Sequence, residues 1–243
     1  ARSALEAKVC IDCFAMRKTG KNSQEWQGKV GMHYDVPMVS YRDALWPEIE
    51  AGRMSWKFVT VDSVHPNTKG HEYMAKFVTR VLEKVLQDLP AKKALPAIKP
   101  MPKPLFTDLF EHVALLEAKA LEPVANEGWT RGATQKREKC WKGKKPGSVV
   151  EFEIEGRAIA MIVWNFRGPM GRARVQLNDQ PPIVVDSWHR HKWGGLRSTR
   201  VLARNLKPGK HRVRIEVLEE KNPQSTGHEF QLLGFGALGV SAR

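Results

Sequence analysis

A proline-rich stretch at residues 89–106 constrains the fold of this chain most strongly. It holds five prolines and four lysines within eighteen residues. Proline has no backbone N–H and its ring clashes with the preceding turn, so this stretch cannot form a helix and should run as an extended, semi-rigid connector. In the 243-residue chain we therefore expect one domain at 1–90, a linker at 91–106 and a second domain at 107–243.

The first part alternates apolar strand-like runs with helical patterns. In chain order, the predicted elements are a strand at 8–16, a helix at 22–35, a strand at 36–41, a helical or turn segment at 42–54 broken by Pro47 and Gly52, and a helix at 67–88. The last helix carries one apolar stripe, made by Met74, Phe77, Val78, Val81, Leu82 and Val85. A strand–helix–strand–helix order favours a parallel sheet with crossover helices.

The second part has a different pattern. Residues 107–123 are rich in Leu, Ala and Glu and predict one short helix, and an all-β pattern begins at Trp129. Val150, Phe152 and Ile154 alternate with acidic residues, which is typical of a half-buried antiparallel strand. About six to eight short strands joined by Asn-Asp, Pro-Gly and Gly-Pro-Met-Gly turns indicate a β-sandwich of jelly-roll type.

The composition and charge limit the partners. A hydrophobic content of 42% is enough for a core in each part. The formal net charge of +14 suits a polyanion, but it equally fits a solvated basic surface. The basic run at 131–145 leaves the same two interpretations open, a grip on phosphate or uronate groups or a solvated loop. Since only Trp129 and Trp141 interleave it, we expect no nucleic-acid partner. No apolar run of 18 residues occurs, so we expect no membrane span.

The three cysteines do not indicate a disulfide framework or a metal site. Cys10 and Cys13 have the spacing of a redox or zinc half-motif, but they lie in an apolar run that predicts a buried strand. We find no further ligands at suitable spacing, and Cys140 stands alone in the second part. We expect no metal and no cofactor.

An acid and a histidine three residues apart, Asp62 and His65, precede the last helix of the first part. In a Ser-His-Asp site the imidazole takes the proton of the serine hydroxyl, and the carboxylate fixes the tautomer and stabilises the imidazolium. This spacing in a loop can place the carboxylate beside a ring nitrogen. The same tetrapeptide also arises by chance, so a purely structural use of both residues is the alternative.

The surrounding residues resemble the closing sequence block of the SGNH, or GDSL-type, hydrolases. Asp62, His65, Pro66, Asn67 and Gly70 match its Asp-x-x-His-Pro-Asn-x-x-Gly pattern position by position. The resemblance covers about residues 1–90. It implies that Asp62 is the triad acid and His65 the base, within a flavodoxin-like three-layer α/β domain of which this segment provides the last two strands and their helices.

The family's nucleophile block, Gly-Asp-Ser, and its oxyanion-hole blocks do not occur in the sequence. Ser63 lies between the acid and the base and should point elsewhere. The other serines that we considered lack an elbow-like turn of small residues: Ser40, Ser55, Ser148, Ser187 and Ser198. We therefore expect the chain to be the C-terminal part of a longer enzyme. A missing N-terminal segment or a second copy should cover the bare edge of the two-stranded sheet.

A loop of the second part, within residues 184–202, concentrates aromatic and imidazole side chains. Trp188, His191 and Trp193 are candidate substrate-binding residues, because indole faces stack on sugars and imidazoles form hydrogen bonds. The alternative is that the tryptophans pack in the core or a domain interface. Jelly-roll sandwiches accompany the SGNH domain in several carbohydrate esterases, which this arrangement resembles.

The sequence thus favours a serine esterase that hydrolyses acyl esters, with acetyl groups on a carbohydrate as the expected substrate. The competing hypothesis is a non-catalytic glycan-binding or assembly protein with a degenerate α/β remnant. The expected partner is an acylated carbohydrate or a small ester. Assembly into a homo-oligomer is an open alternative. By analogy alone the likeness favours a secreted or periplasmic bacterial protein.

Overall fold

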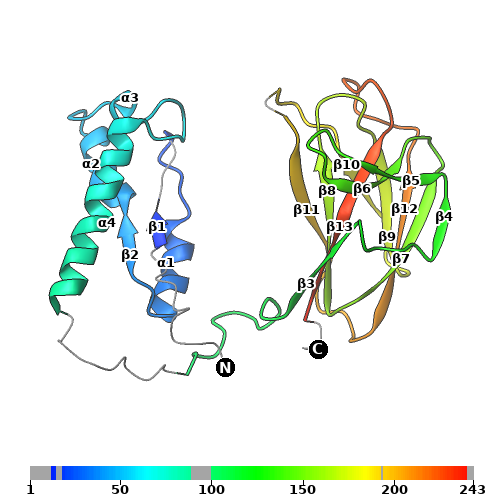
Figure 1. The fold of residues 1–243 in the computed structure, drawn as a ribbon, viewed down its shortest axis with the longest axis horizontal. Coiled ribbons are helices and arrows are strands. Elements are labelled where there is room, and N and C mark those ends of the chain that lie inside the picture. The colour runs from blue at the N-terminus through cyan, green and yellow to red at the C-terminus, as the bar shows by residue number, and fades with distance from the viewer. Residues whose placement is uncertain (1–11, 15–17, 89–99, 193, 240–243) are drawn as a thin grey trace. The chain divides into compact units, whose positions relative to one another are not determined.

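The computed structural model describes residues 12–14, 18–88, 100–192 and 194–239. The chain divides into two compact units, Ala1–Leu105 and Phe106–Arg243, which are described separately (Figure 1). The expected linker at 91–106 falls largely on residues outside the described ranges. Its limits, and those of the domains on either side, therefore stay predictions.

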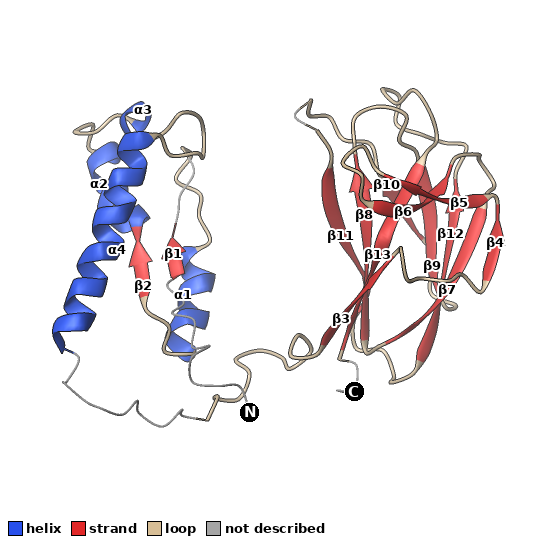
Figure 2. Ribbon diagram, in the orientation of Figure 1, coloured by secondary structure: helices blue, strands red, loops and turns tan. Residues whose placement is uncertain are grey.

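The first unit combines helices with a short sheet (Figure 2). Its elements are β1 (Asp12–Phe14), α1 (Gln24–His33), β2 (Met38–Ser40), α2 (Tyr41–Glu50), α3 (Trp56–Val59) and α4 (Thr68–Asp88). β1 and β2 pair in parallel, with Cys13 opposite Val39, as the strand–helix alternation predicted. The described part of this unit contains two strands, so a three-layer architecture is not evident in it. Cys10 and the side chain of Cys13 lie outside the described residues.

The segment at 42–54 forms a more regular helix than its sequence predicted. The Ser40 hydroxyl accepts a hydrogen bond from the N–H of Asp43 at 3.0 Å and so caps the start of α2. We expected Pro47 to break this segment, but α2 continues through it to Glu50. Proline removes one N–H donor while its carbonyl still accepts from the N–H of Ala51 at 3.1 Å, so the last turn is retained.

α4 packs closely on α3 at its first turn. The buried hydrophobic residues of the described part of this unit are Val39, Tyr41, Leu45 and Val59. The expected stripe of α4 faces them in part, since Met74, Phe77, Val78 and Val81 are half-buried. Tyr41 and Phe77 stack with ring centroids 6.1 Å apart. This packing fixes the end of the unit at which α3, the following loop and α4 meet.

The second unit consists of two antiparallel sheets that form a β-sandwich. Its strands are β3 (Val113–Glu117), β4 (Ala125–Glu127), β5 (Trp129–Ala133), β6 (Lys139–Gly143), β7 (Val149–Glu155), β8 (Ala158–Asn165), β9 (Arg172–Leu177), β10 (Ile183–Asp186), β11 (Leu196–Ala203), β12 (Lys210–Val217) and β13 (Phe230–Leu238). One sheet has the order β10-β9-β12-β7-β4 and the other β11-β8-β13-β6-β5. The sandwich predicted from the alternating pattern is confirmed, while the jelly-roll connectivity stays a prediction.

The core lies between these two sheets. Val150, Phe152 and Ile154 of β7 are fully buried, as their shared face predicted. Val213, Ile215 and Val217 of β12 join the same cluster. On the opposite face Arg214 lies within 3.7 Å of Glu151 and 2.7 Å of Glu216. The period-two pattern therefore separates an apolar interior from an ion-paired exterior.

β13 is the central strand of the second sheet. It pairs with β8 along one side, and along the other it pairs first with β6 and then with β3. All nine of its residues are buried. Gly234 has φ 149°, and a Cβ there would lie 2.2 Å from the carbonyl oxygen of Leu116. Only glycine lets β3 approach at this point.

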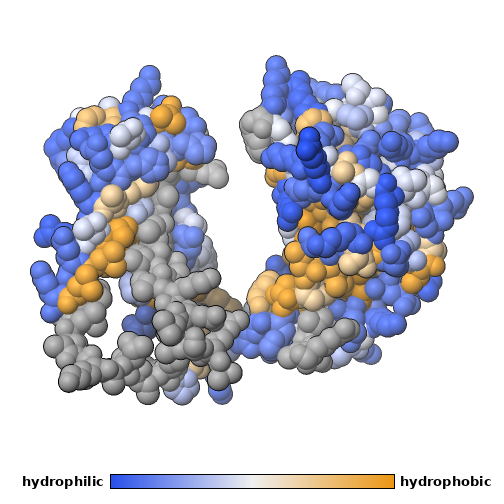
Figure 3. Space-filling view, viewed as in Figure 1, coloured by the Kyte–Doolittle hydropathy of each residue, from blue (hydrophilic) through white to orange (hydrophobic). Residues whose placement is uncertain are grey.

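The prediction of a helix at 107–123 was wrong, because the strand β3 occupies the centre of this range. Ala114 and Leu116 pack on the core, while Val113 and Leu115 lie on the outer face and are more than half exposed. Val201 of β11 is also exposed. Figure 3 shows hydrophobic side chains gathered on one face of the second unit. Strand formation here comes from pairing with β13, which outweighs the local helix propensity.

Among the described residues, no helix has the length and apolar character needed to cross a membrane.

Candidate active site

The loop between α3 and α4 carries Asp62 and His65. It is closed by the N–H of Val61, which donates to the carbonyl of His65 at 2.9 Å. Within it, one carboxylate oxygen of Asp62, Oδ1, accepts hydrogen bonds from the N–H groups of Val64 and His65, both at 2.8 Å. Aspartate is favoured in such turns because its side chain can bond backbone N–H groups two and three residues ahead.

The same carboxylate meets the histidine ring. Asp62 Oδ2 lies 2.7 Å from His65 Nδ1. The pKa of Asp62 is lowered to about 2, first by the backbone N–H of His65, then by that of Val64 and by the imidazole. An ionised carboxylate can only accept hydrogen bonds, so Nδ1 carries the proton and Nε2 of the neutral ring is left with a lone pair. The pair thus has the orientation of a triad acid and base.

Both side chains are open to solvent. The His65 side chain is 71% exposed and that of Asp62 is 51% exposed. Across the described ranges of the chain, no hydroxyl is hydrogen-bonded to His65 Nε2. Ser63 takes part through its backbone, since its carbonyl accepts from the N–H of Lys18 at 3.2 Å. That bond brings the segment after β1 beside the loop. That a serine nucleophile acts together with His65 stays a prediction.

Asn67 and Gly70 join the Asp62–His65 loop to α4. Asn67 Oδ1 accepts from the N–H of Gly70 at 2.9 Å, which is the bond of a helix-capping residue. Its Nδ2 donates to the carbonyls of Lys57 and Phe58, each at 3.1 Å. A Cβ on Gly70 would lie 2.1 Å from the Val59 carbonyl oxygen. These two motif residues therefore hold α4 against α3, on either side of the loop.

Trp56, at the start of α3, makes a contact with this loop that the sequence did not predict. Its indole Nε1 donates to the backbone carbonyl of Asp62 at 2.6 Å. No spacing rule signals this bond, because it depends on how α3 sits beside the loop.

The three sugar-binding candidates lie in or near the segment between β10 and β11. Trp188 is half-buried and packs on the cluster of Cys140, Trp164, Met170 and Leu233, with its indole Nε1 buried and unpartnered among the described residues. His191 is exposed, and its ring centroid lies 4.9 Å from that of His189. Trp193 lies outside the described residues. The structure thus gives Trp188 a packing contact and places His191 at the surface.

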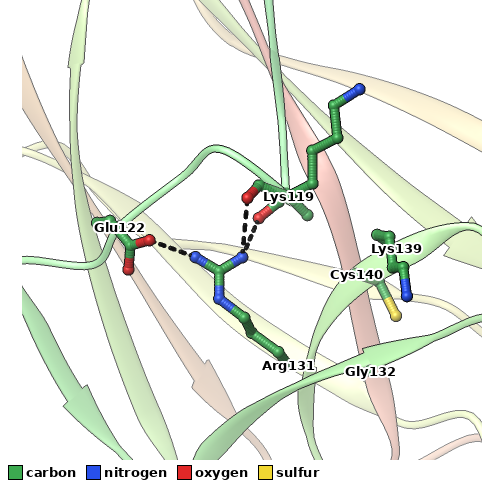
Figure 4. A pocket seen from close by; sticks show the side chains of 7 residues that line it. Lys119, Glu122, Arg131, Gly132, Lys139 and Cys140 are labelled. Carbon is green, nitrogen blue, oxygen red and sulfur yellow. Dashed lines mark hydrogen bonds and ion pairs between the residues drawn. The ribbon is translucent and has the colours of Figure 1, made fainter.

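The basic run at 131–145 is not a loop but most of the β5–β6 hairpin. Arg131 borders a cavity of about 510 Å³ with Lys119, Lys139 and Cys140 (Figure 4). Its guanidinium donates to the carbonyls of Ala118, Lys119 and Leu121 and lies 4.5 Å above the Trp141 ring. These bonds occupy the guanidinium, so Arg131 fastens the segment after β3 to the sandwich.

The described residues contain no group of three or more His, Cys, Asp or Glu side chains placed to hold a metal ion.

Comparison with known proteins identifies a similar fold. No protein-family model and no curated protein matches the sequence. The chain resembles the crystal structure of a two-domain esterase (CEX) active on acetylated mannans, with a TM-score of 0.79, 22% identity, and coverage of 96% of this chain and 63% of that one. The same esterase co-crystallised with mannopentaose gives a TM-score of 0.79, 21% identity, and coverage of 96% and 62%. The chain therefore has the fold of this carbohydrate esterase over nearly all its length, and spans less than two thirds of the esterase's own length.

Proposed function

We propose that the chain is part of an SGNH-class carbohydrate esterase that removes acetyl groups by a Ser-His-Asp mechanism. The observation that carries the proposal is the 2.7 Å contact between Asp62 Oδ2 and His65 Nδ1, in a loop that matches the family's closing motif. The fold shared with an esterase active on acetylated mannans supports the reaction class. In this proposal residues 1–90 belong to the catalytic domain, 91–106 to a linker and 107–243 to the sandwich.

In the proposed reaction His65 Nε2 takes the proton of a serine hydroxyl as its oxygen attacks the acetyl carbonyl. His65 then gives this proton to the sugar oxygen, which leaves as an alcohol, and an acetyl-serine remains. A water molecule attacks that ester while His65 takes its proton and returns it to the serine, so that acetate is released. Asp62 keeps its charge throughout and stabilises the imidazolium.

The serine and the oxyanion donors are assigned to polypeptide other than residues 1–243 of this chain, as a preceding segment or a second copy. Within the described ranges β1 and β2 pair only with each other, so a further strand would complete the sheet. Such a strand would bring its own C-terminal loop to the end of the sheet where α3 and α4 meet. Side chains at the carboxyl ends of parallel strands meet at one edge, which suits a site assembled in this way.

The substrate class follows from the second unit. We assign the segment that contains Trp188, His191 and Trp193 to contact with the carbohydrate. The esterase with this fold was co-crystallised with mannopentaose, which supports a mannan or a related acetylated glycan as the ligand. Replacing His191 with Ala should raise KM for the acetylated polysaccharide and leave hydrolysis of nitrophenyl acetate unchanged.

The decisive experiment compares His65→Ala with His71→Ala in the protein expressed with its upstream coding sequence. His71 is an exposed histidine on α4 that lies outside the proposed site. We expect His65→Ala to lower kcat/KM on nitrophenyl acetate and on acetylated mannan by about 10²- to 10⁴-fold, the range for loss of a general base. His71→Ala should retain activity. Full activity of His65→Ala would refute the proposal. The 243-residue chain alone should show little hydrolysis.

A glycan-binding protein without catalysis is the competing function, favoured by the separate sandwich unit. It predicts binding of mannopentaose together with no esterase activity in the longer protein. Calorimetric titration and the hydrolysis assay on the same sample separate the two.

A further inference from the structure

The Asp62–His65 loop is held mainly by hydrogen bonds, because its side chains are exposed. Asp62 uses both carboxylate oxygens on atoms within the loop itself. The structure around the loop holds it by further bonds, among them Asn67 N–H to Val59 O, Lys18 N–H to Ser63 O, and Trp56 Nε1 to Asp62 O. Of these, the indole bond is the shortest at 2.6 Å, and it contacts the acid residue itself.

Trp56 forms hydrogen bonds with Thr60 and with Asp62, the two ends of the segment that leads into the loop. Its backbone carbonyl accepts from the N–H of Thr60 at 3.1 Å and from the Thr60 hydroxyl at 2.8 Å. Its indole donates forward to Asp62. The ring is half-buried and lines a small cavity with Leu45, Val59, Pro66 and Met74. The indole is therefore held by packing, and its N–H is presented at a fixed place.

The bond from the Trp56 indole to the Asp62 carbonyl sets the orientation of the backbone where the chain enters the Asp62 turn. Fixing the carbonyl of Asp62 fixes the plane of the peptide between residues 62 and 63. That plane sets where the next N–H groups, those of Val64 and His65, point relative to the carboxylate. Water can replace the indole as a donor to an exposed carbonyl, but water does not fix that plane. Loss of the indole N–H should loosen the geometry while leaving the fold intact.

We propose that Trp56 is a positioning residue of this site, whose indole N–H orients the Asp62 turn and through it the imidazole of His65. The assignment rests on the proposed function of Asp62 and His65 as acid and base. It adds a residue that the motif does not contain and that acts through the Asp62 turn.

The test replaces Trp56 with Phe, and with benzothienylalanine, which keeps the two-ring shape and lacks the N–H. The control is Trp26→Phe on α1, an exposed tryptophan (63%) away from the loop. NMR on the 243-residue chain follows the titration of the Asp62 carboxyl and the Nδ1 proton of His65. Both Trp56 variants should move the Asp62 midpoint from about 2 toward its ordinary 3.8 and speed exchange of the Nδ1 proton. Trp26→Phe should change neither.

In the longer, active protein the benzothienylalanine variant should lower kcat by about five- to tenfold, the loss expected for one neutral hydrogen bond, with little change in KM. An unchanged Asp62 midpoint and Nδ1 proton in that variant would overturn the assignment, as would equal changes in Trp26→Phe. If Trp56→Phe unfolds the chain, the benzothienylalanine variant alone decides whether Trp56 positions the Asp62 turn. Failure of the proposed function would be seen separately, as hydrolysis that does not depend on His65, while the NMR readouts still test the positioning role.

Discussion

At the scale of single residues, the site depends on one carboxylate that accepts three hydrogen bonds. Asp62 Oδ1 takes two backbone N–H groups and Oδ2 takes the imidazole, so each oxygen has a different function. One oxygen shapes the loop and the other orients the imidazole of His65. A substitution can separate the two functions.

Asp62→Asn should retain the loop and lose the orientation of the ring. The amide oxygen can still accept from Val64 and His65, but the amide NH₂ cannot accept the proton on Nδ1. We expect the Nδ1 proton signal of His65 to disappear, and kcat of the longer protein to fall by about 10³- to 10⁴-fold. Nitrogen-15 NMR of the ring and hydrolysis rates check this. Asp179→Asn, at an exposed position of the sandwich, is the matched control, and an unaltered ring tautomer in Asp62→Asn would contradict the prediction.

The low pKa of Asp62 gives a pH dependence with a defined sign. Its pKa is lowered to about 2 from an ordinary 3.8 by the N–H groups of His65 and Val64 and by the imidazole. Because the folded pKa is below the unfolded one, the bonds of the loop stabilise the fold above the ordinary value. This contribution decreases as the pH falls from 3.8 toward 2 and is lost below that. Carbon-13 titration of the carboxyl should give a midpoint near 2, and a midpoint near 4 would contradict it.

Cys140 should be unreactive in the native protein. Burial raises its thiol pKa to about 11, and the residue is 2% exposed. At pH 8 only about one thiol in a thousand would be ionised, and the thiolate is the reactive form. With Cys10 and Cys13 replaced by Ser, a disulfide reagent should modify Cys140 slowly until the chain is denatured. Rapid modification of the folded variant would show that the β5–β6 region opens.

At the scale of elements, the loop is placed by the contact between α3 and the first turn of α4. Asn67 caps α4 and also binds two carbonyls of α3, and Gly70 allows the two helices to touch. The asparagine and glycine of the motif thus serve the packing of these two helices, whereas Asp62 and His65 are the residues proposed to carry the chemistry.

Gly70→Ala should separate these helices. The added Cβ would lie 2.1 Å from the Val59 carbonyl oxygen, and backbone cannot move aside as a flexible side chain can. We expect a loss of about 1–3 kcal/mol in the free energy of unfolding of the first unit, as for other overpacked sites. Gly236→Ala is the control, since its Cβ would meet only Ala160 at 3.9 Å. Thermal unfolding of both variants tests this, and equal midpoints would contradict it.

The sequence predicted elements where local pattern and tertiary packing agree. α4 has a clear stripe, and β7 and β12 alternate with period two, so all three were recognised. β3 was not, because Val113–Glu117 has helix-favouring Leu, Ala and Glu and becomes a strand only by pairing with a distant β13. The motif brought attention to Asp62 and His65, whose side chains lie 2.7 Å apart, while their roles as acid and base stay a prediction. Trp56 was not, since an indole bond to a carbonyl has no sequence pattern.

At the scale of the whole molecule, the two units differ in how much core they contain. The main hydrophobic cluster, from Ala118 to Ala237, belongs entirely to the second unit. In the described part of the first unit few hydrophobic residues are buried, while Trp26, Met32 and Leu86 are more than 60% exposed. This is the distribution expected when further polypeptide covers the first unit.

The isolated units should therefore behave differently. A fragment of residues 106–243 should unfold in one cooperative transition, because its core is complete. A fragment of residues 1–105 should unfold with little cooperativity or self-associate through its bare strands and exposed apolar residues. Calorimetry and light scattering on both fragments measure this. A cooperative, monomeric 1–105 fragment would contradict the need for a covering segment.

The place of β13 has a consequence during synthesis of the protein. Among the described strands, β13, which joins β8, β6 and β3, is made last, so this sheet cannot close until Leu238 has left the ribosome. Until then the nascent sandwich carries three strands whose partner has yet to emerge. A premature stop codon shortly before Phe230 would leave a product that chaperones and proteases must handle, although only a small part of the sandwich would be lacking.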